Sequence, residues 1–358
     1  MKKACFIINN MGSGGGTERV ALTIINALAE KGHDITLLNL WQDDDMAFFN
    51  ISSKVKVSCL STSKTSFYLS YFSIVKKIRN FVKVHNFDTV INVESTLSLF
   101  IAPALCANKA WHVNWEHYNF TANGGSKLRT ISRYIAAWMA DTVVTLTHRD
   151  ADIWKKRARP RAEILPINNP LPFAQEAYNY NPDAKVVLAV GRLSYQKGFD
   201  SLLSAWKEVT RDVQDWQLRI VGNGEDETSL RAQVGKLEIT NSVTFFPPTK
   251  NIETHYREAG IYCMSSRFEG LPMVLIEANS YGLPIVSFNC LTGPSEVVEN
   301  NVSGLLAAPE NIDELAEKLK YMIKHRSERI KFSKAAYDSS PKFKLDNIIK
   351  QWEELINR

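Results

Sequence analysis

Short apolar runs alternate with amphipathic segments along the whole 358-residue chain. Runs of four to six residues rich in Val, Ile and aromatic side chains are typical of buried strands, and a helical period fills the stretches between them. In the first half the predicted strands are 4–8, 35–40, 89–93, 111–115 and 142–145, and the predicted helices are 17–31, 67–85, 96–107 and 126–140. In the second half the predicted strands are 186–190, 217–221, 243–246, 261–264, 284–287 and 304–307. This order indicates an α/β chain with doubly wound parallel sheets.

The length of the chain favours two domains, because 358 residues exceed what one hydrophobic core usually serves. A stretch rich in Pro and Asn, Pro166 to Pro172, separates the two series of strands and is predicted to be the linker. We therefore expect a first domain over 1–170 and a second over 171–341.

Composition excludes several classes of protein. With 45% hydrophobic and 23% charged residues the chain resembles ordinary globular proteins. Its five cysteines are scattered without metal-ligand spacing, which favours reduced thiols and a cytoplasmic location. The short apolar run after Lys3 predicts a first strand and no signal peptide, and no run is long enough for a spanning helix. Asp43-Asp44-Asp45 is predicted to be a solvated loop and not a metal site.

Positive charge is concentrated in the first half. Residues 1–170 contain 21 Lys and Arg against 13 Asp and Glu, whereas the remainder contains 22 against 25. The excess lies mainly in 76–83 and 149–161, and the first of these overlaps an apolar stripe within 67–82. Two interpretations stay open: a solvated face over a core helix, or a surface that holds the protein against anionic lipid. Nucleic-acid binding is disfavoured, because the basic residues are not interleaved with aromatic ones.

Two glutamates bracket the most informative segment. Glu269 lies in the turn Phe268-Glu269-Gly270-Leu271-Pro272, and Glu277 follows within a predicted helix. At this spacing both carboxylates can face one cleft, where they would accept charge-assisted hydrogen bonds from sugar and ribose hydroxyls.

Two cations and a glycine loop predict an anion site. Arg192 comes directly after the strand 186–190, and Lys197 follows in a loop that contains Gly198. Ligands of α/β sheets bind at such strand ends. Gly14-Gly15-Gly16 lies between a strand and a helix, where backbone N–H groups can face an anion. A dinucleotide site does not fit, because Thr17 replaces the third glycine and no acidic residue ends the second strand.

These motifs together resemble the retaining glycosyltransferases of family 4. The resemblance covers nearly the whole chain and is most specific in these segments: Val190-Gly191-Arg192-Leu193, Lys197-Gly198-Phe199, Phe268 to Glu277, and Gly293-Pro294-Ser295-Glu296. It implies the GT-B fold, in which two Rossmann-like domains face each other across a cleft. It also implies that the last helix, within 342–358, crosses back onto the first domain after Ser339-Ser340-Pro341.

The resemblance assigns expected roles to individual residues. Catalysis would fall to Arg192, Lys197, Glu269 and His117, the two cations holding the donor diphosphate in place of a metal ion. Donor binding would involve Gly15, Gly16, Phe268, Gly270, Leu271 and Glu277 in addition. Glu116 and His117 would face the acceptor or the donor's primary hydroxyl. No metal cofactor is expected.

The activity that the resemblance implies is transfer of a hexose or N-acetylhexosamine from a UDP-sugar to a glycan, with retained configuration. The acceptor would be a lipid-linked precursor of a surface polysaccharide at the inner face of the cytoplasmic membrane. Phe246-Pro247-Pro248 departs from the family pattern and weakens the choice of nucleobase. Two alternatives remain open at this point, a nucleotide-sugar 2-epimerase of the same fold and a non-catalytic glycan-binding protein.

Overall fold

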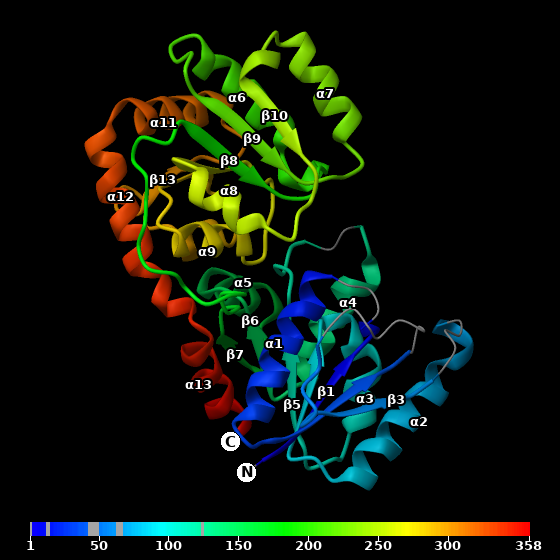
Figure 1. Cartoon of the computed structure of the whole chain (residues 1–358). Helices are drawn as coiled ribbons and strands as arrows, with labels where there is room; N and C mark the ends of the chain where they lie inside the picture. The colour runs from blue at the N-terminus through cyan, green and yellow to red at the C-terminus, as the bar shows by residue number, and fades with distance from the viewer. Residues whose placement is uncertain (1, 12–14, 42–49, 62–66, 123–124) are drawn as a thin grey trace. The chain divides into compact units, whose positions relative to one another are not determined.

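A computed structural model describes residues 2–11, 15–41, 50–61, 67–122 and 125–358 (Figure 1). The chain divides into two compact units, residues 1–172 with 345–358, and residues 173–344. The sequence predicts boundaries after residues 170 and 341, and the units divide after Pro172 and Lys344. In each unit, helices cover both faces of a parallel sheet (Figure 1).

The sheet of unit 1 has the order β3-β2-β1-β4-β5-β6-β7. Its strands are β1 (Lys3–Ile8), β2 (Asp34–Asn39), β3 (Lys56–Cys59), β4 (Thr89–Val93), β5 (Trp111–Trp115), β6 (Thr142–Thr145) and β7 (Glu163–Pro166). The two edge strands, β3 and β7, are absent from the sequence prediction. Both are four residues long, and β3 is largely exposed, so neither has the apolar run of an interior strand. The strand order reverses between β1 and β4.

The helices of unit 1 are α1 (Gly16–Glu30), α2 (Phe67–His85), α3 (Ser98–Leu105), α4 (Lys127–Met139), α5 (His148–Ala158) and α13 (Leu345–Ile356). A short 3₁₀ turn, η3 (Ser95–Leu97), precedes α3. The apolar stripe of α2 belongs to the core, since Ile74, Ile78 and Val82 are at most 4% exposed. The final helix, α13, packs Trp352 against Phe6 and Trp115.

The sheet of unit 2 has the order β10-β9-β8-β11-β12-β13. Its strands are β8 (Val186–Val190), β9 (Gln217–Val221), β10 (Val243–Phe246), β11 (Ile261–Met264), β12 (Ile285–Phe288) and β13 (Gly304–Ala307). The strand order reverses between β8 and β11. In such sheets ligands bind at the carboxyl ends of the strands on either side of the reversal.

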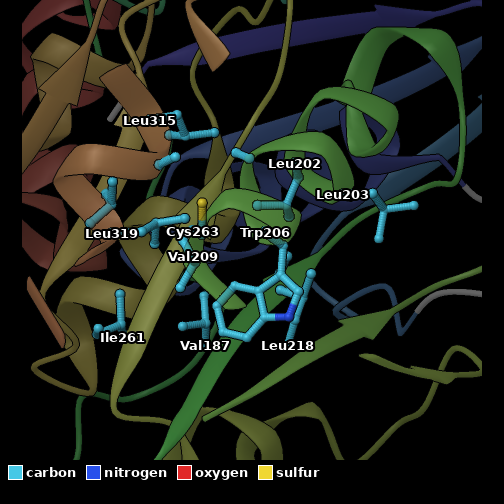
Figure 2. Close-up of a cluster of buried hydrophobic side chains, with 14 of the residues drawn as sticks. Val187, Leu202, Leu203, Trp206, Val209, Leu218, Ile261, Cys263, Leu315 and Leu319 are labelled. Carbon is cyan, nitrogen blue, oxygen red and sulfur yellow. The ribbon is translucent and has the colours of Figure 1, made fainter. Parts of the chain in front are cut away.

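The helices of unit 2 are α6 (Phe199–Thr210), α7 (Glu227–Lys236), α8 (Ile252–Glu258), α9 (Met273–Ser280), α10 (Pro294–Val297), α11 (Ile312–Lys324) and α12 (Arg326–Ser339). Single 3₁₀ turns are η4 (Tyr195–Lys197), η5 (Thr240–Ser242) and η6 (Ser340–Phe343). Figure 2 shows the core, in which Trp206 of α6 gathers with Val187, Val209 and Leu218. This packing fixes β8 and β9, and therefore the loops at their carboxyl ends.

Candidate active site

Lys197 and Glu269 form an ion pair at the carboxyl ends of β8 and β11. The Lys197 Nζ lies 2.6 Å from the Glu269 Oε1, and both side chains are largely shielded from solvent. Gly198 follows Lys197 with φ of 62°, and any Cβ there would lie 2.2 Å from the carbonyl oxygen of Ser265. Glycine is therefore required for the loop after β8 to approach the loop after β11 this closely.

Arg267 ties these two loops together. Its guanidinium donates two hydrogen bonds to the Asp200 carboxylate, at 2.9 and 2.6 Å, and one to the carbonyl oxygen of Tyr195. It also lies over the Tyr195 ring, 4.2 Å from the centroid. Paired hydrogen bonds from a planar guanidinium fix direction as well as distance. Arg267, which the sequence analysis does not single out, thus positions Lys197 opposite Glu269.

A third loop, after β12, supports the turn that contains Glu269. The Thr292 hydroxyl donates to the backbone carbonyl of Glu269 at 2.5 Å. Gly293 has φ of 100°, and a Cβ there would lie 2.8 Å from the carbonyl oxygen of Gly270. Within the turn Leu271 is buried and Phe268 is partly exposed. Three strand-end loops therefore converge on one short turn.

Glu277 lies on α9, the helix that follows this turn. The buried Tyr256 hydroxyl donates to the Glu277 Oε2 at 2.7 Å. Burial and the neighbouring Glu277 carboxylate raise the pKa of Tyr256 well above its usual range, so this hydroxyl stays a donor. Tyr256 also stacks on Tyr281 at 5.3 Å. The tyrosine holds one oxygen of Glu277 in a fixed direction.

Arg192, another of the predicted site residues, is exposed to solvent. It lies in the loop after β8, 73% of its side chain is accessible, and it pairs at 3.0 Å with Glu225, which is 55% exposed. An exposed ion pair contributes little to stability, so Arg192 can exchange its partner for a ligand anion at small cost.

In unit 1 the carboxyl ends of β4 and β5 carry a buried polar network. Glu116, directly after β5, accepts hydrogen bonds from Ser95, from Arg133 and from the backbone N–H groups of His117 and Tyr118. Both Glu116 and Arg133 are almost fully buried. With its oxygens already occupied, the Glu116 carboxylate holds the 116–118 turn in shape. The acceptor-facing role expected of Glu116 would require these hydrogen bonds to break.

His117 presents the opposite situation. Its ring is buried beside Trp115, with the centroids 4.5 Å apart, and its Nε2 has no hydrogen-bond partner among the described residues. Burial lowers the pKa of His117 to about 3, so the imidazole is neutral near pH 7. A buried nitrogen without a partner is costly, and a ligand hydroxyl would satisfy it.

Glu94 is a further candidate that the sequence analysis does not identify. It follows β4 at the strand-order reversal, with φ of 81° and ψ of 135°, a conformation that side chains other than glycine rarely adopt. Arg129 donates to its Oε1 at 2.8 Å, while burial and Glu116 raise the pKa of Glu94. The sequence offered one signal for Glu94, because it is an acidic residue directly after the predicted strand 89–93.

Gly15 and Gly16 begin α1. Gly15 precedes the first helical residue, and a Cβ on Gly16 would meet no atom within 4 Å. Packing within the protein therefore does not require glycine at position 16, and the donor-binding role of Gly15 and Gly16 stays a prediction. The other glycines of this loop, Gly12 and Gly14, lie outside the described residues, as does Asp43-Asp44-Asp45.

Two features lie apart from these strand ends. A cavity of about 570 Å3 opens at the amino ends of β4 and β5, on the opposite edge of the unit 1 sheet, and contains Lys2, Arg79 and Lys83. Its position separates it from the strand-end residues described above. Within the described chain, no group of three His, Cys, Asp or Glu side chains could hold a metal ion. None of the described helices has both the length and the apolarity needed to cross a membrane.

Comparison with known sequences assigns both units. Residues 172–339 match the family model for glycosyl transferases group 1, and residues 14–174 match the model for Glycosyltransferase Family 4. An uncharacterized glycosyltransferase of Haemophilus influenzae is 36% identical over 99% of this chain and 100% of that protein. The amylovoran biosynthesis glycosyltransferase AmsD of Erwinia amylovora is 30% identical over the full length of both.

Solved structures agree in fold. The lipopolysaccharide outer core galactosyltransferase WaaB superposes with a TM-score of 0.81, at 21% identity over 99% of both chains. HepE from Anabaena, in complex with UDP and glucose, superposes with a TM-score of 0.77, at 19% identity over 100% of both chains. The expected GT-B fold, two Rossmann-like α/β domains, is thereby confirmed. The chain belongs to the group 1 glycosyltransferases of family 4.

Proposed function

We propose that this glycosyltransferase is retaining and metal-independent, and that it moves a hexose or N-acetylhexosamine from a UDP-sugar to a lipid-linked precursor of a surface polysaccharide. The single observation that carries the proposal is the Lys197–Glu269 pair, held at 2.6 Å where the strand order of unit 2 reverses. A cation and a carboxylate side by side provide one group for the diphosphate and one for the sugar hydroxyls.

The charges fit departure of a nucleoside diphosphate. The bond between the sugar C1 and the β-phosphate oxygen breaks, and the electron pair leaves with the phosphate. The acceptor hydroxyl forms the new bond to C1 on the same face and gives its proton to the departing phosphate oxygen. Lys197 and Arg192 would stabilise the negative charge that develops on that phosphate. Glu277 would bind the ribose diol, with its direction fixed by Tyr256.

The acceptor and the location are inferred from relatives and charge. A Campylobacter jejuni relative, 26% identical over 99% of this chain, is named GalNAc-alpha-(1->4)-GalNAc-alpha-(1->3)-diNAcBac-PP-undecaprenol alpha-1,4-N-acetyl-D-galactosaminyltransferase. AmsD is named for amylovoran biosynthesis. HepE was solved with UDP-glucose, which supports UDP as the carrier. The cationic excess of residues 1–170 favours work at the anionic inner face of the cytoplasmic membrane.

A donor panel with mass-spectrometric detection tests the proposal. Purified protein is incubated with UDP-glucose, UDP-galactose and their N-acetyl forms, each with undecaprenyl-diphosphate-linked oligosaccharide and EDTA. We expect one UDP-sugar to extend the acceptor, with the anomeric configuration of the donor retained in the product. An epimerised nucleotide-sugar formed without acceptor would instead establish the 2-epimerase alternative. Absence of both products, and of any UDP binding, would favour the glycan-binding alternative.

A further inference from the structure

The solvent-facing side of α4 is apolar. Its exposed or half-exposed residues recur at helical spacing and are Leu128, Ile131, Tyr134, Ile135, Trp138 and Met139. The five most accessible of these are each between 42% and 50% exposed. The buried side of the same helix contains Ser132 and Arg133 beside two alanines. A surface helix normally exposes its polar residues and buries its apolar ones. The opposite arrangement on α4 indicates that its exposed face binds a partner.

A cationic segment, residues 155–161, contacts one end of this apolar face through Ala158 and Arg161. Trp138 donates its indole N–H to the carbonyl oxygen of Ala158, the last residue of α5, at 3.1 Å. The Arg161 guanidinium lies over the Trp138 ring, 4.9 Å from the centroid. The cations of this segment are all exposed, and within the described chain none forms an ion pair; they are Lys155, Lys156, Arg157, Arg159 and Arg161. The apolar face of α4 therefore lies next to a cationic segment whose charges form no ion pair within the described chain.

We propose that α4 and the 155–161 segment form a docking surface for an anionic lipid bilayer. This inference deepens the proposed function, which supplies the membrane-bound acceptor, and it names the residues that make the contact. Apolar side chains of an amphipathic helix enter the boundary between headgroups and acyl chains, while adjacent Lys and Arg bind anionic headgroups. Tyr134 and Trp138 suit this boundary because each combines an apolar ring with one polar group, and the indole N–H of Trp138 is already satisfied by Ala158.

Charge argues against a second copy of the chain as the occupant. In a two-fold dimer this surface would meet a second copy of itself, which is also cationic and could not neutralise the five cations. Anionic lipid satisfies both the apolar and the cationic parts. The earlier candidate surface on α2 differs, because its apolar stripe is core and, over residues 70–85, the exposed apolar side chains Phe72 and Val84 are isolated from each other.

Vesicle sedimentation with paired variants tests the apolar half of the surface. Full-length protein is mixed with vesicles of phosphatidylcholine containing 30% phosphatidylglycerol, or of phosphatidylcholine alone. The wild type is expected to sediment with the first and not with the second. Leu128→Gln with Ile131→Gln removes apolar area without adding charge, and we expect at least about a tenfold loss of partitioning. The matched control is Phe72→Gln with Val84→Gln on α2, which should partition like the wild type.

The cationic half is tested in the same way. Lys155→Gln with Lys156→Gln should weaken binding by about tenfold or more at low salt. The control, Lys76→Gln with Lys77→Gln, removes an adjacent pair of exposed lysines from α2 and should have the smaller effect. Equal losses in the α4–α5 and the α2 variants would overturn the proposal. So would a change in oligomeric state of the α4 variant with unchanged vesicle binding, because that result would make α4 a self-association face.

A thermal shift with UDP on the same variants separates the two proposals. Every variant should keep the response of the wild type to UDP, because the substituted residues lie in unit 1 and outside the donor loops. Retained UDP response with lost vesicle binding supports the docking surface. No UDP response in any protein, with vesicle binding intact, would remove the proposed donor and leave the docking surface standing.

Discussion

The two units treat the charged residues at the carboxyl ends of their strands in opposite ways. In unit 1 the charged pair at the strand ends, Glu116 and Arg133, is almost fully enclosed and satisfied by its own neighbours. In unit 2 Arg192 is largely solvated, and Lys197 is 20% exposed and pairs with Glu269. One set of charges fixes a turn, whereas the other is available to a ligand. Charged residues at strand ends of two similar sheets therefore need not have similar roles, and their burial distinguishes them.

This difference assigns distinct tasks to the two halves. Under the proposed function, unit 2 would present positive charge to a diphosphate, since the solvated Arg192 can exchange its partner at small cost. Unit 1 presents a neutral imidazole, His117, on a turn held by a buried salt bridge. A neutral ring nitrogen suits a sugar hydroxyl better than a phosphate.

The largest effect is expected from breaking the buried pair in unit 1. Arg133→Ala leaves the Glu116 carboxylate buried without its cation, which should cost roughly 3–5 kcal/mol of unfolding free energy. Urea denaturation, followed by circular dichroism, measures it. The control is Arg257→Ala, which removes an exposed pair with Glu176 in unit 2 and should change stability little. Similar losses in both variants would contradict the contrast between the units.

The next largest effect concerns Lys197 and catalysis. Lys197→Ala removes the shielded cation from the expected position of the leaving phosphate, and we expect transfer to fall about 10²–10³-fold. Initial rates at saturating donor measure this effect. Lys185→Ala is the matched control, because Lys185 precedes the amino end of β8 and pairs with Asp215 in solvent. A rate unchanged in Lys197→Ala would remove the proposed mechanism.

A smaller effect distinguishes His117 by its pH dependence. The pKa of His117 is about 3 in the folded protein, against an ordinary 6.5, so below pH 6.5 the unfolded chain binds a proton that the folded chain does not. The stabilisation is complete above pH 6.5 and is lost as pH falls toward 3. Between pH 7 and 5, His117→Gln should therefore lose about 2 kcal/mol less stability than the wild type. His325→Gln, at an exposed histidine, should follow the wild type, and equal losses in all three would refute the assignment.

The smallest effect is expected at Arg192. Because its side chain is largely solvated and paired with Glu225, Arg192→Ala should weaken UDP binding by less than about tenfold. Glu225→Gln, which frees Arg192, should leave UDP binding equal or slightly tighter. Fluorescence-detected titration with UDP measures both. A larger loss in Arg192→Ala than in Lys197→Ala would reverse the ranking of the two cations.

Most of the fold followed from the pattern of apolar runs. The interior strands β4, β5 and β6 coincide with their predicted ranges, because β-branched and aromatic residues predominate in them. The edge strands β3 and β7 have no such run. Helix α5 is also absent from the sequence prediction, which treats its basic residues only as a cluster of charge. The helix nevertheless begins with an ordinary cap, in which the Thr147 hydroxyl accepts a hydrogen bond from the backbone N–H of Asp150.

The candidate site was predictable only in part. Lys197, Glu269 and Glu277 are conspicuous because charged residues next to Gly and Pro turns rarely serve a core. The sequence alone could not predict which side chains contact one another. The structure shows that Tyr256 orients Glu277, that Arg267 ties two loops together, and that Glu116 is buried. These contacts join residues far apart in the chain, and no local spacing encodes them.

Isothermal titration calorimetry with UDP and with uridine tests the central claim most directly. If the diphosphate binds at the ends of β8 and β11, Lys197→Ala should weaken UDP by about tenfold to a hundredfold and leave uridine unchanged, while Lys185→Ala leaves both unchanged. Equal affinity of wild type and Lys197→Ala for UDP would contradict the claim, because the shielded cation at the strand-order reversal would then not contact the diphosphate.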